Sequence, residues 1–392
     1  MEMSKVSRRT AIKSLVGTAA LAGAVTGFPA ILRAQDKIKL GFLSGLTGLE
    51  TLLGETQLNC FKLAVDEVNA AGGAGGRQIE YVVEDDQTTT RGAIDKARKL
   101  ISQDKTDAII GLIASLEHVA ARSVTTPNKK LLIYTTYFEG GVCEKYFFAT
   151  SQVPNQQIDP TVDWLSGNVG KSVYILASDY IWPRKSTDSI RAAFDRIGGK
   201  VLGAEYYPFG TQDFGPALDR IRAANPDMVW MMVAGSDAIT ALKQYRSFGI
   251  KSQLVSNGLD ELFSFSHPEL TEGALSNQAY YMTLDNSKNQ AFVAAYKAKF
   301  GADKPINAIG EAAYDAVHLY ALAVAKAGST DVEKVIPAMR SVEFEAPQGR
   351  INFAANNMLR ANSLLGRGKP DGNWEIVKNF GQIDPIVPGC SL

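Results

Sequence analysis

Cysteine and histidine are scarce in this chain. Its 392 residues include three cysteines and three histidines. The cysteine spacing matches no metal-binding motif, and three histidines offer few further ligands, so we expect no metal ion and no other cofactor. In an oxidising compartment three cysteines allow one disulfide and one free thiol. The sequence does not determine which two of Cys60, Cys143 and Cys390 pair.

Catalytic motifs are also lacking. The chain has no nucleophile elbow, no phosphate-binding loop and no cysteine–histidine constellation. The glycine-rich residues 72–76 miss the G-x-G-x-x-G register and follow a predicted helix, so they indicate a turn. His118 and His318 fall on predicted helices, and His267 precedes a proline in a loop. We therefore expect a protein that is not an enzyme.

Neither sign of charge is in excess. The chain has 41 basic and 41 acidic residues, and its first 34 residues hold five of the basic ones and one acidic one. The remainder therefore has 36 basic and 40 acidic residues, a net charge of about −4. This balance favours neither nucleic acid nor an anionic membrane surface as a partner.

Long apolar runs are absent after residue 34, where no segment approaches the roughly 18 residues of a membrane helix. Residues 7–13, Ser-Arg-Arg-Thr-Ala-Ile-Lys, match the twin-arginine export pattern, and a short run of small apolar residues follows at 14–28. We expect residues 1–34 to be a twin-arginine signal peptide cleaved after Ala34. The mature protein is then expected in the periplasm.

The chain does contain a regular alternation of strand and helix patterns. Each strand–helix unit takes about 25 to 30 residues, enough for a parallel βαβ crossover. The series restarts after Pro154, which predicts an α/β fold of two doubly wound parallel-sheet lobes. Helices at 289–300 and 307–327 are expected to cover the first lobe. Strands are predicted at 38–42, 79–83, 107–112, 131–134, 173–177, 200–207, 228–233, 253–257 and 279–282. The tail, 349–353 and then 364–377 with Asp371-Gly372 as its turn, is expected to form a hairpin.

Residues 131–157 join the two series. A short apolar strand at 131–134 leads into a polar, aromatic segment, and Pro154-Asn155-Gln156-Gln157 then opens the second series. In α/β sheets, ligands bind at the carboxyl ends of parallel strands. This stretch therefore predicts a cleft wall followed by a hinge, and the alternative is a buried strand with an ordinary loop.

Three motifs carry a resemblance to a known family. They are Tyr134-Thr135-Thr136-Tyr137-Phe138-Glu139-Gly140, Pro154-Asn155-Gln156-Gln157 and Ser178-Asp179-Tyr180-Ile181-Trp182-Pro183-Arg184. With the leader and the strand order, they make residues 35–392 resemble the type I periplasmic solute-binding proteins of the leucine/isoleucine/valine-binding family. Within that family the motifs are most similar to the amide- and urea-binding branch.

The resemblance implies two lobes joined by three crossovers, near 151–157, 280–286 and 340–348. Lobe 1 would then comprise 35–152 and 284–342, and lobe 2 would comprise 153–283 and 343–392. Such proteins close on a small solute and deliver it to an ABC permease in the inner membrane. We expect a monomer, with the small-molecule ligand and the permease as its partners.

The resemblance also implies a set of ligand-binding residues. Carried over by position, Ser115, Tyr134 and Thr136 line the first-lobe wall and Tyr180 and Trp182 the second, and Gly235 and Asp260 complete the set. The hydroxyls suit a carbonyl or carboxylate oxygen, and the rings suit a flat, neutral ligand. Each has a structural alternative: Ser115 as a helix cap, Tyr134 as core filling, and Trp182 as a surface ring beside Pro183.

The ligand stays open between an amide or urea and an amino acid. Ile113 and Trp182 stand where amide binders tend to place tyrosine, which makes the pocket poorer in hydroxyls. An amino acid needs an acid for its ammonium group, since an unpaired buried charge is costly. Such an acid could be Glu139, Asp237, Asp260 or Glu261. Two further alternatives are a branched-chain or other hydrophobic amino acid as ligand, and a ligand-sensing protein instead of a transport component.

Overall fold

The first lobe is built on a five-stranded parallel sheet. A computed structural model of the chain describes residues 37–392, so the predicted signal peptide lies outside the described residues. Strands β3 and β4 are uniformly apolar because both faces of the sheet are covered. The strand order is β2-β1-β3-β4-β5, with β1 at Ile38–Ser44, β2 at Ile79–Asp85, β3 at Ala108–Gly111, β4 at Leu131–Tyr134 and β5 at Phe147–Ala149.

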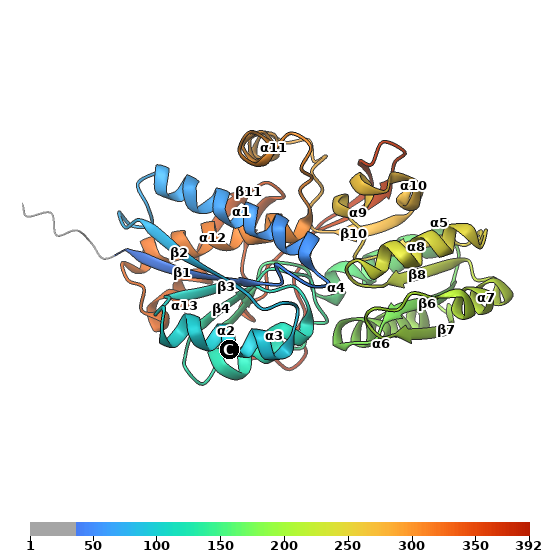
Figure 1. Ribbon diagram of the computed structural model, residues 1–392, viewed down its shortest axis with the longest axis horizontal. Helices are drawn as coiled ribbons and strands as arrows, with labels where there is room; N and C mark the ends of the chain where they lie inside the picture. The colour runs from blue at the N-terminus through green and yellow to red at the C-terminus, as the bar shows by residue number, and fades with distance from the viewer. Residues whose placement is uncertain (1–36) are drawn as a thin grey trace, which may run out of the picture. The chain divides into compact units, whose positions relative to one another are not determined.

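Helices cover both faces of this sheet (Figure 1). Helices α1 (Thr51–Ala70) and α12 (Ala308–Ala327) pack together on one face, and α2 (Thr90–Ser102) and α3 (Ser115–Thr125) pack on the other. Helices α11 (Ser287–Phe300) and α13 (Val332–Met339) join the first of these layers. The two late helices therefore cover the first lobe, as the sequence predicts.

The second lobe is built on a seven-stranded mixed sheet, in the order β14-β13-β10-β9-β8-β6-β7. Its helices again lie on both faces, so two doubly wound α/β lobes are confirmed. The strands are β6 (Ser172–Ser178), β7 (Lys200–Tyr207), β8 (Met228–Met232), β9 (Gln253–Ser256), β10 (Leu275–Gln278), β13 (Asn362–Gly368) and β14 (Trp374–Gln382). The helices are α4 (Pro154–Gln157), α5 (Asp159–Asn168), α6 (Ile181–Arg196), α7 (Gly215–Ala224), α8 (Asp237–Ser247), α9 (Glu261–Ser266) and α10 (Pro268–Thr271).

Two segments depart from the sequence prediction. The strand expected at 279–282 lies at 275–278, because Tyr280 packs into the first-lobe core and Tyr281 into the second. Strands β11 (Glu343–Ala346) and β12 (Gly349–Asn352) pair with each other, and residues from both pack into the first-lobe core. Phe353 also meets Phe148 there, with ring centroids 4.9 Å apart. Residues 343–361 therefore pack with lobe 1, and the chain returns to the second sheet at β13.

The side chain of Gln152 connects the three crossovers through hydrogen bonds. The side-chain amide of Gln152, just after β5, donates to Asn277 Oδ1 at the end of β10 and to the Asn362 carbonyl at the start of β13, both at 3.0 Å. These residues are buried or half-buried, where hydrogen bonds of this kind fix the local geometry. The three strands that connect the lobes thus share one polar centre.

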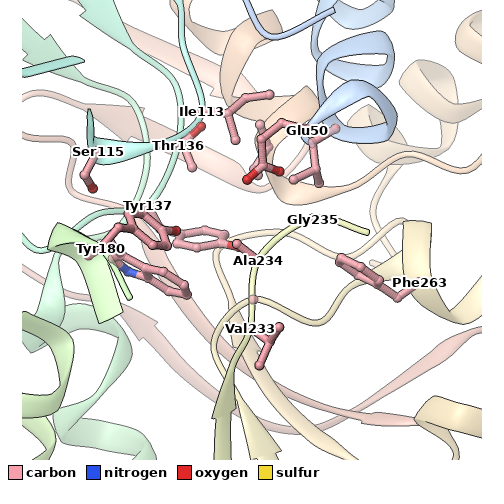
Figure 2. Close-up of a pocket in the computed structure, with 14 residues that line it drawn as sticks. Glu50, Ile113, Ser115, Thr136, Tyr137, Tyr180, Val233, Ala234, Gly235 and Phe263 are labelled. Carbon is pink, nitrogen blue, oxygen red and sulfur yellow. The ribbon is translucent and has the colours of Figure 1, made fainter. Parts of the chain in front are cut away.

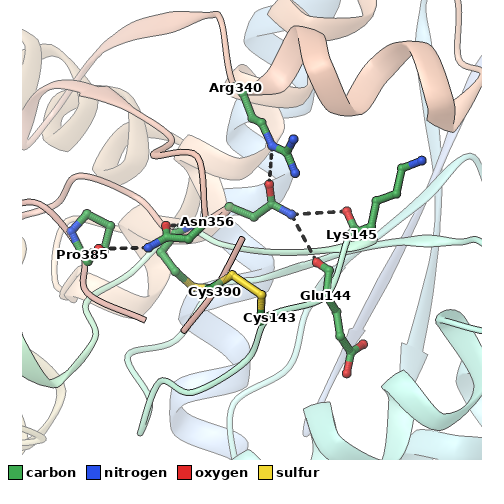
Figure 3. Close-up of a disulfide and its surroundings, with 9 residues drawn as sticks. Cys143, Glu144, Lys145, Arg340, Asn356, Pro385 and Cys390 are labelled. Carbon is green, nitrogen blue, oxygen red and sulfur yellow. Dashed lines mark hydrogen bonds between the residues drawn. A yellow bond between two sulfur atoms is a disulfide. The ribbon is translucent and has the colours of Figure 1, made fainter. Parts of the chain in front are cut away.

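A disulfide joins the C-terminal tail to the first lobe (Figure 3). Cys143, after β4, is bonded to Cys390, with the Cα atoms 5.4 Å apart, and Cys60 is a buried free thiol on α1. Beside the disulfide, Asn357 Nδ2 donates to the Glu144 carbonyl at 3.2 Å. The pairing that the sequence left open is therefore 143–390, and it anchors the tail to lobe 1.

Candidate ligand-binding site

A cavity lies between the lobes, at the carboxyl ends of the parallel strands of both sheets (Figure 2). Its accessible volume is about 30 Å³. By the same measure one water molecule needs about 10–15 Å³. In this closed arrangement it therefore suits a small ligand. The first lobe contributes Glu50, Leu53, Ile113, Ser115, Thr136, Tyr137 and Ile309, and the second contributes Tyr180, Trp182, Val233, Ala234, Gly235, Gly258 and Phe263.

Five of the seven predicted site residues line this cavity. Helix α6 begins at Ile181, so Trp182 lies buried in its first turn and is not a surface ring. Tyr180 directly precedes the helix, and Gly235 follows β8. The five lining residues are Ser115, Thr136, Tyr180, Trp182 and Gly235.

The other two predicted residues, Tyr134 and Asp260, do not line the cavity. Tyr134 is fully buried, its hydroxyl donates to the Ile113 carbonyl, and its ring packs on His118. Asp260 caps α9 and accepts a 2.7 Å hydrogen bond from Asn307 Nδ2 of the first lobe. Burial raises the pKa of Asp260 to about 7. Tyr134 thus fills the core, and Asp260 links the two lobes.

Ser115 and Thr136 both donate their hydroxyl hydrogens inside the protein. Thr136 Oγ1 donates to the Leu112 carbonyl at 2.9 Å, and Ser115 Oγ donates to the Glu139 carboxylate. Burial raises the pKa of Glu139, but hydrogen bonds and charge from His118 outweigh it and leave the net pKa below the usual value. Both hydroxyls therefore keep only lone pairs for a ligand. This differs from the expected role of donating to a ligand oxygen.

The helix-cap role expected of Ser115 is taken by another residue. Helix α3 has Ala114 at its N-cap position and Ser115 as its first residue. Glu117 accepts the backbone N–H groups of Ile113 at 2.8 Å and Ala114 at 2.9 Å. The N–H groups of Glu117 and His118, from which a capping Ser115 side chain would accept, donate instead to the Ala114 carbonyl.

Aromatic rings from both lobes meet at the cavity. The Tyr137 ring of the first lobe lies 5.4 Å from the Trp182 ring of the second, centroid to centroid, and Tyr180 lies 6.2 Å from Trp182. The buried Trp182 Nε1–H has no hydrogen-bond partner within residues 37–392. Tyr137 belongs to the motif at 134–140 but not to the predicted site. Its position in the loop after β4 could have predicted that it lines the cavity.

Glu50 is the charged lining residue that sequence reasoning missed. It follows the β1 loop, is 2% exposed, and its Oε2 atom has no hydrogen-bond partner among the described residues. Figure 2 shows its carboxyl group pointing into the cavity. Burial, and then the negative charge of Asp237, raise the pKa of Glu50 from 4.5 to about 7. The signal was present, since Glu50 is the only acid in residues 45–50.

The four acids considered from sequence are engaged elsewhere. Glu139 binds Ser115, and Asp260 binds Asn307. Asp237 accepts the Gly210 backbone N–H, and Glu261 accepts that of Met282, both at 2.7 Å. None of the four lines the cavity, and the lining also contains no lysine, arginine or histidine. Within residues 37–392 no cluster of His, Cys, Asp and Glu is arranged to hold a metal ion.

Two glycines allow the lobes to approach at the cavity. A Cβ atom on Gly235 would lie 2.5 Å from the Leu49 carbonyl oxygen, and the Gly235 φ of +54° also favours glycine. A Cβ atom on Gly258 would lie 3.1 Å from the Tyr137 hydroxyl. Loops of the second lobe therefore contact the first lobe directly, and the cleft is closed.

Two α/β lobes, three connections and a small cavity between the strand ends define the class of two-lobed solute-binding proteins. The chain belongs to the periplasmic binding protein family, whose model matches residues 37–373. In the segment that the structure describes, no helix is both long and apolar enough to cross a membrane.

Individual relatives differ in the ligands their names give. A leucine-, isoleucine-, valine-, threonine- and alanine-binding protein of Pseudomonas aeruginosa is 25% identical, over 86% of this chain and 91% of its own. An isoleucine complex of a branched-chain amino acid binding protein from Streptococcus pneumoniae has a TM-score of 0.80 at 25% identity, covering 88% of this chain and 100% of its own. A Rhodopseudomonas palustris protein bound to 3,4-dihydroxybenzoic acid has a TM-score of 0.81 at 25% identity, covering 90% and 99%.

Proposed function

We propose that this protein is the substrate-binding component of an ABC importer, and that it captures a small polar solute and delivers it to the permease. The observation that carries the proposal is the small cavity enclosed by polar and aromatic groups from both lobes. A cavity of this kind forms only when the lobes meet, so binding and closure are linked. Membership of the periplasmic binding protein family supports the same function.

The proposed ligand is a nitrogen-bearing solute, either a short amide or urea-like compound or an amino acid. The lone pairs of Ser115 and Thr136 favour N–H donors, which all of these compounds carry. A branched-chain or other hydrophobic amino acid is the second candidate. It is favoured by the apolar lining side chains Leu53, Ile113, Val233, Phe263 and Ile309, and by the amino-acid-binding relatives.

A thermal-shift screen tests the proposal. Amides, ureas, amino acids and small carboxylates are added to the purified protein, and a compound that binds the folded state raises its melting temperature. Small-angle scattering then measures closure with the strongest compound. We expect the radius of gyration to fall as the lobes rotate about their connections. No stabilisation by any compound, or no compaction at saturation, would count against the proposed function.

Export to the periplasm is part of the proposal, through the twin-arginine pattern at Arg8 and Arg9. Replacing both by lysine is expected to leave the precursor in the cytoplasm, measured by cell fractionation and blotting. Mature protein in the periplasm of the double variant would contradict the twin-arginine route. A cytoplasmic location of the unchanged protein would favour the ligand-sensing alternative over transport.

A further inference from the structure

We propose that Glu50 determines the charge of the ligand, and that the solute carries a positively charged nitrogen group, an ammonium or amidinium, against this carboxylate. The inference rests on the proposed function, because it concerns the same cavity. It adds the charge of the ligand, which neither the fold nor the relatives decide.

The first step is that one carboxylate oxygen of Glu50 has no hydrogen-bond donor among the described residues. Its side chain is 2% exposed, and its Oε2 atom has no hydrogen-bond donor within residues 37–392. An isolated buried carboxylate is costly, and buried charges in proteins are normally paired. Because no lysine, arginine or histidine lines the cavity, the matching charge has to come from the solute.

The second step is that two polar side chains of the first-lobe wall offer acceptors. Ser115 and Thr136 use their hydrogens on Glu139 and on the Leu112 carbonyl. Both residues line the same cavity as Glu50, whose carboxyl group points into it (Figure 2). Three acceptors around one small space suit a group with several N–H donors, as an ammonium or amidinium has.

The third step is the aromatic wall opposite. The rings of Tyr137, Tyr180 and Trp182 line the same cavity, with centroids of neighbouring rings 5.4 and 6.2 Å apart. Aromatic faces attract cations through the ring quadrupole, most strongly where water is excluded. The free Trp182 Nε1–H remains as a donor for an oxygen elsewhere on the solute.

The same features disfavour an anion. A solute with a carboxylate as its only charged group, such as the aromatic acid bound by the Rhodopseudomonas palustris relative, would place its charge beside Glu50 with no cation to balance it. Like charges at short range in a dry site repel strongly. We therefore expect this chain to differ from that relative in the charge it accepts.

Ligand series of one shape and different charge test the inference. Acetamidine, acetamide and acetate form one series, and benzamidine, benzamide and benzoate form another. Isoleucine and 3-methylpentanoate are compared in the same way, since the second lacks the ammonium group. Each is titrated calorimetrically at pH 8 into the purified protein, into Glu50→Gln, and into the control Glu272→Gln, which removes an exposed carboxyl group of the second lobe.

In the unchanged protein and in the control, we expect at least one cationic compound to bind about ten- to a hundredfold more tightly than its neutral or anionic counterpart. In Glu50→Gln this preference should disappear, because an amide of the same shape carries no charge. A circular dichroism spectrum and melting curve confirm that the variant is folded.

Two results would overturn the inference and leave the proposed function intact. One is that no compound with a positively charged nitrogen group binds the unchanged protein more tightly than its neutral or anionic counterpart. The other is a charge preference that persists in Glu50→Gln. Binding by none of these compounds, and by none of the amides, ureas, amino acids and carboxylates of the screen, would instead refute the proposed function.

Discussion

Replacing Glu50 by glutamine is expected to make closure of the ligand-free protein less dependent on pH. In the closed cleft, burial and the charge of Asp237 raise the pKa of Glu50 from 4.5 to about 7. When Glu50 is ionised, the free energy of the closed state is therefore about 3 kcal/mol less favourable, relative to an open state in which water reaches the carboxylate. The cost is absent below pH 4.5, grows as the pH rises to about 7, and is constant above that. It shifts the open-to-closed ratio by about two orders of magnitude.

Small-angle scattering of the ligand-free protein at pH 5 and pH 8 measures this effect. For the unchanged protein we expect the radius of gyration to increase at pH 8, as the lobes separate and hydrate Glu50. In Glu50→Gln the increase should be much smaller, because the amide has no charge to hydrate. The control Glu272→Gln should behave like the unchanged protein.

Other groups at the closed cleft have to be separated from Glu50. Burial also raises the pKa of Asp260 to about 7, so its ionisation opposes closure in the same pH range and with the same sign. Glu117 and Glu261, whose pKa values burial raises well above the usual range, and the hydroxyls of Tyr137 and Tyr180 also lie near. The double variant Glu50→Gln with Asp260→Asn should therefore remove most of the remaining change, since asparagine still caps α9. An equal pH response in the unchanged protein and in Glu50→Gln would refute the reasoning.

Three further predictions concern the cleft and its frame. Thr136→Val should weaken ligand binding by roughly ten- to a hundredfold through one lost hydrogen bond, measured by calorimetry. Trp182→Ala should weaken it at least as much. Unchanged affinity in both variants would mean that neither residue binds the ligand. Gly235→Ala should weaken binding and reduce ligand-induced compaction, because its Cβ would lie 2.5 Å from a first-lobe carbonyl oxygen; normal compaction would show that the loops adjust. Cys390→Ser should lower the free energy of unfolding by about 2–5 kcal/mol in non-reducing denaturation, and equal stability of the two proteins would mean that the bond to Cys143 does not restrain the unfolded chain.

The fold was predictable where local patterns and tertiary burial agree. Leu-Leu-Ile-Tyr at 131–134 is apolar at every position, as a central parallel strand buried on both faces requires, and the strand has these bounds. The prediction failed at Tyr280 and Tyr281, which have strand-like side chains but pack into two different cores. It also failed at 343–361, because β11 and β12 alternate exposed and buried residues like any edge hairpin. Only packing shows that their apolar residues enter the first lobe.

The site was predictable to the level of loops. Five of the seven proposed residues line the cavity because each follows the carboxyl end of a parallel strand, which topology alone brings together. The position of a side chain within its loop was not predictable. Asp260 lies in such a loop and Tyr134 is the last residue of such a strand, but Asp260 bonds to Asn307 and Tyr134 to the Ile113 carbonyl. Those bonds depend on residues far away in the sequence.

Whether the polar groups of the cleft donate or accept hydrogen bonds depends on contacts that residue types do not reveal. A threonine or serine can donate or accept, and only the Leu112 carbonyl and the Glu139 carboxylate decide that Thr136 and Ser115 accept from a ligand. Glu50 acquires its significance in the same way, because a carboxyl group that would be solvated in an open loop is enclosed by the second lobe. Because Glu50 forms no ion pair with any residue of 37–392, we expect the empty lobes to open and the lobes to close on a cation. Recognition and closure would thus depend on one unpaired charge, so the isosteric Glu50→Gln variant tests both.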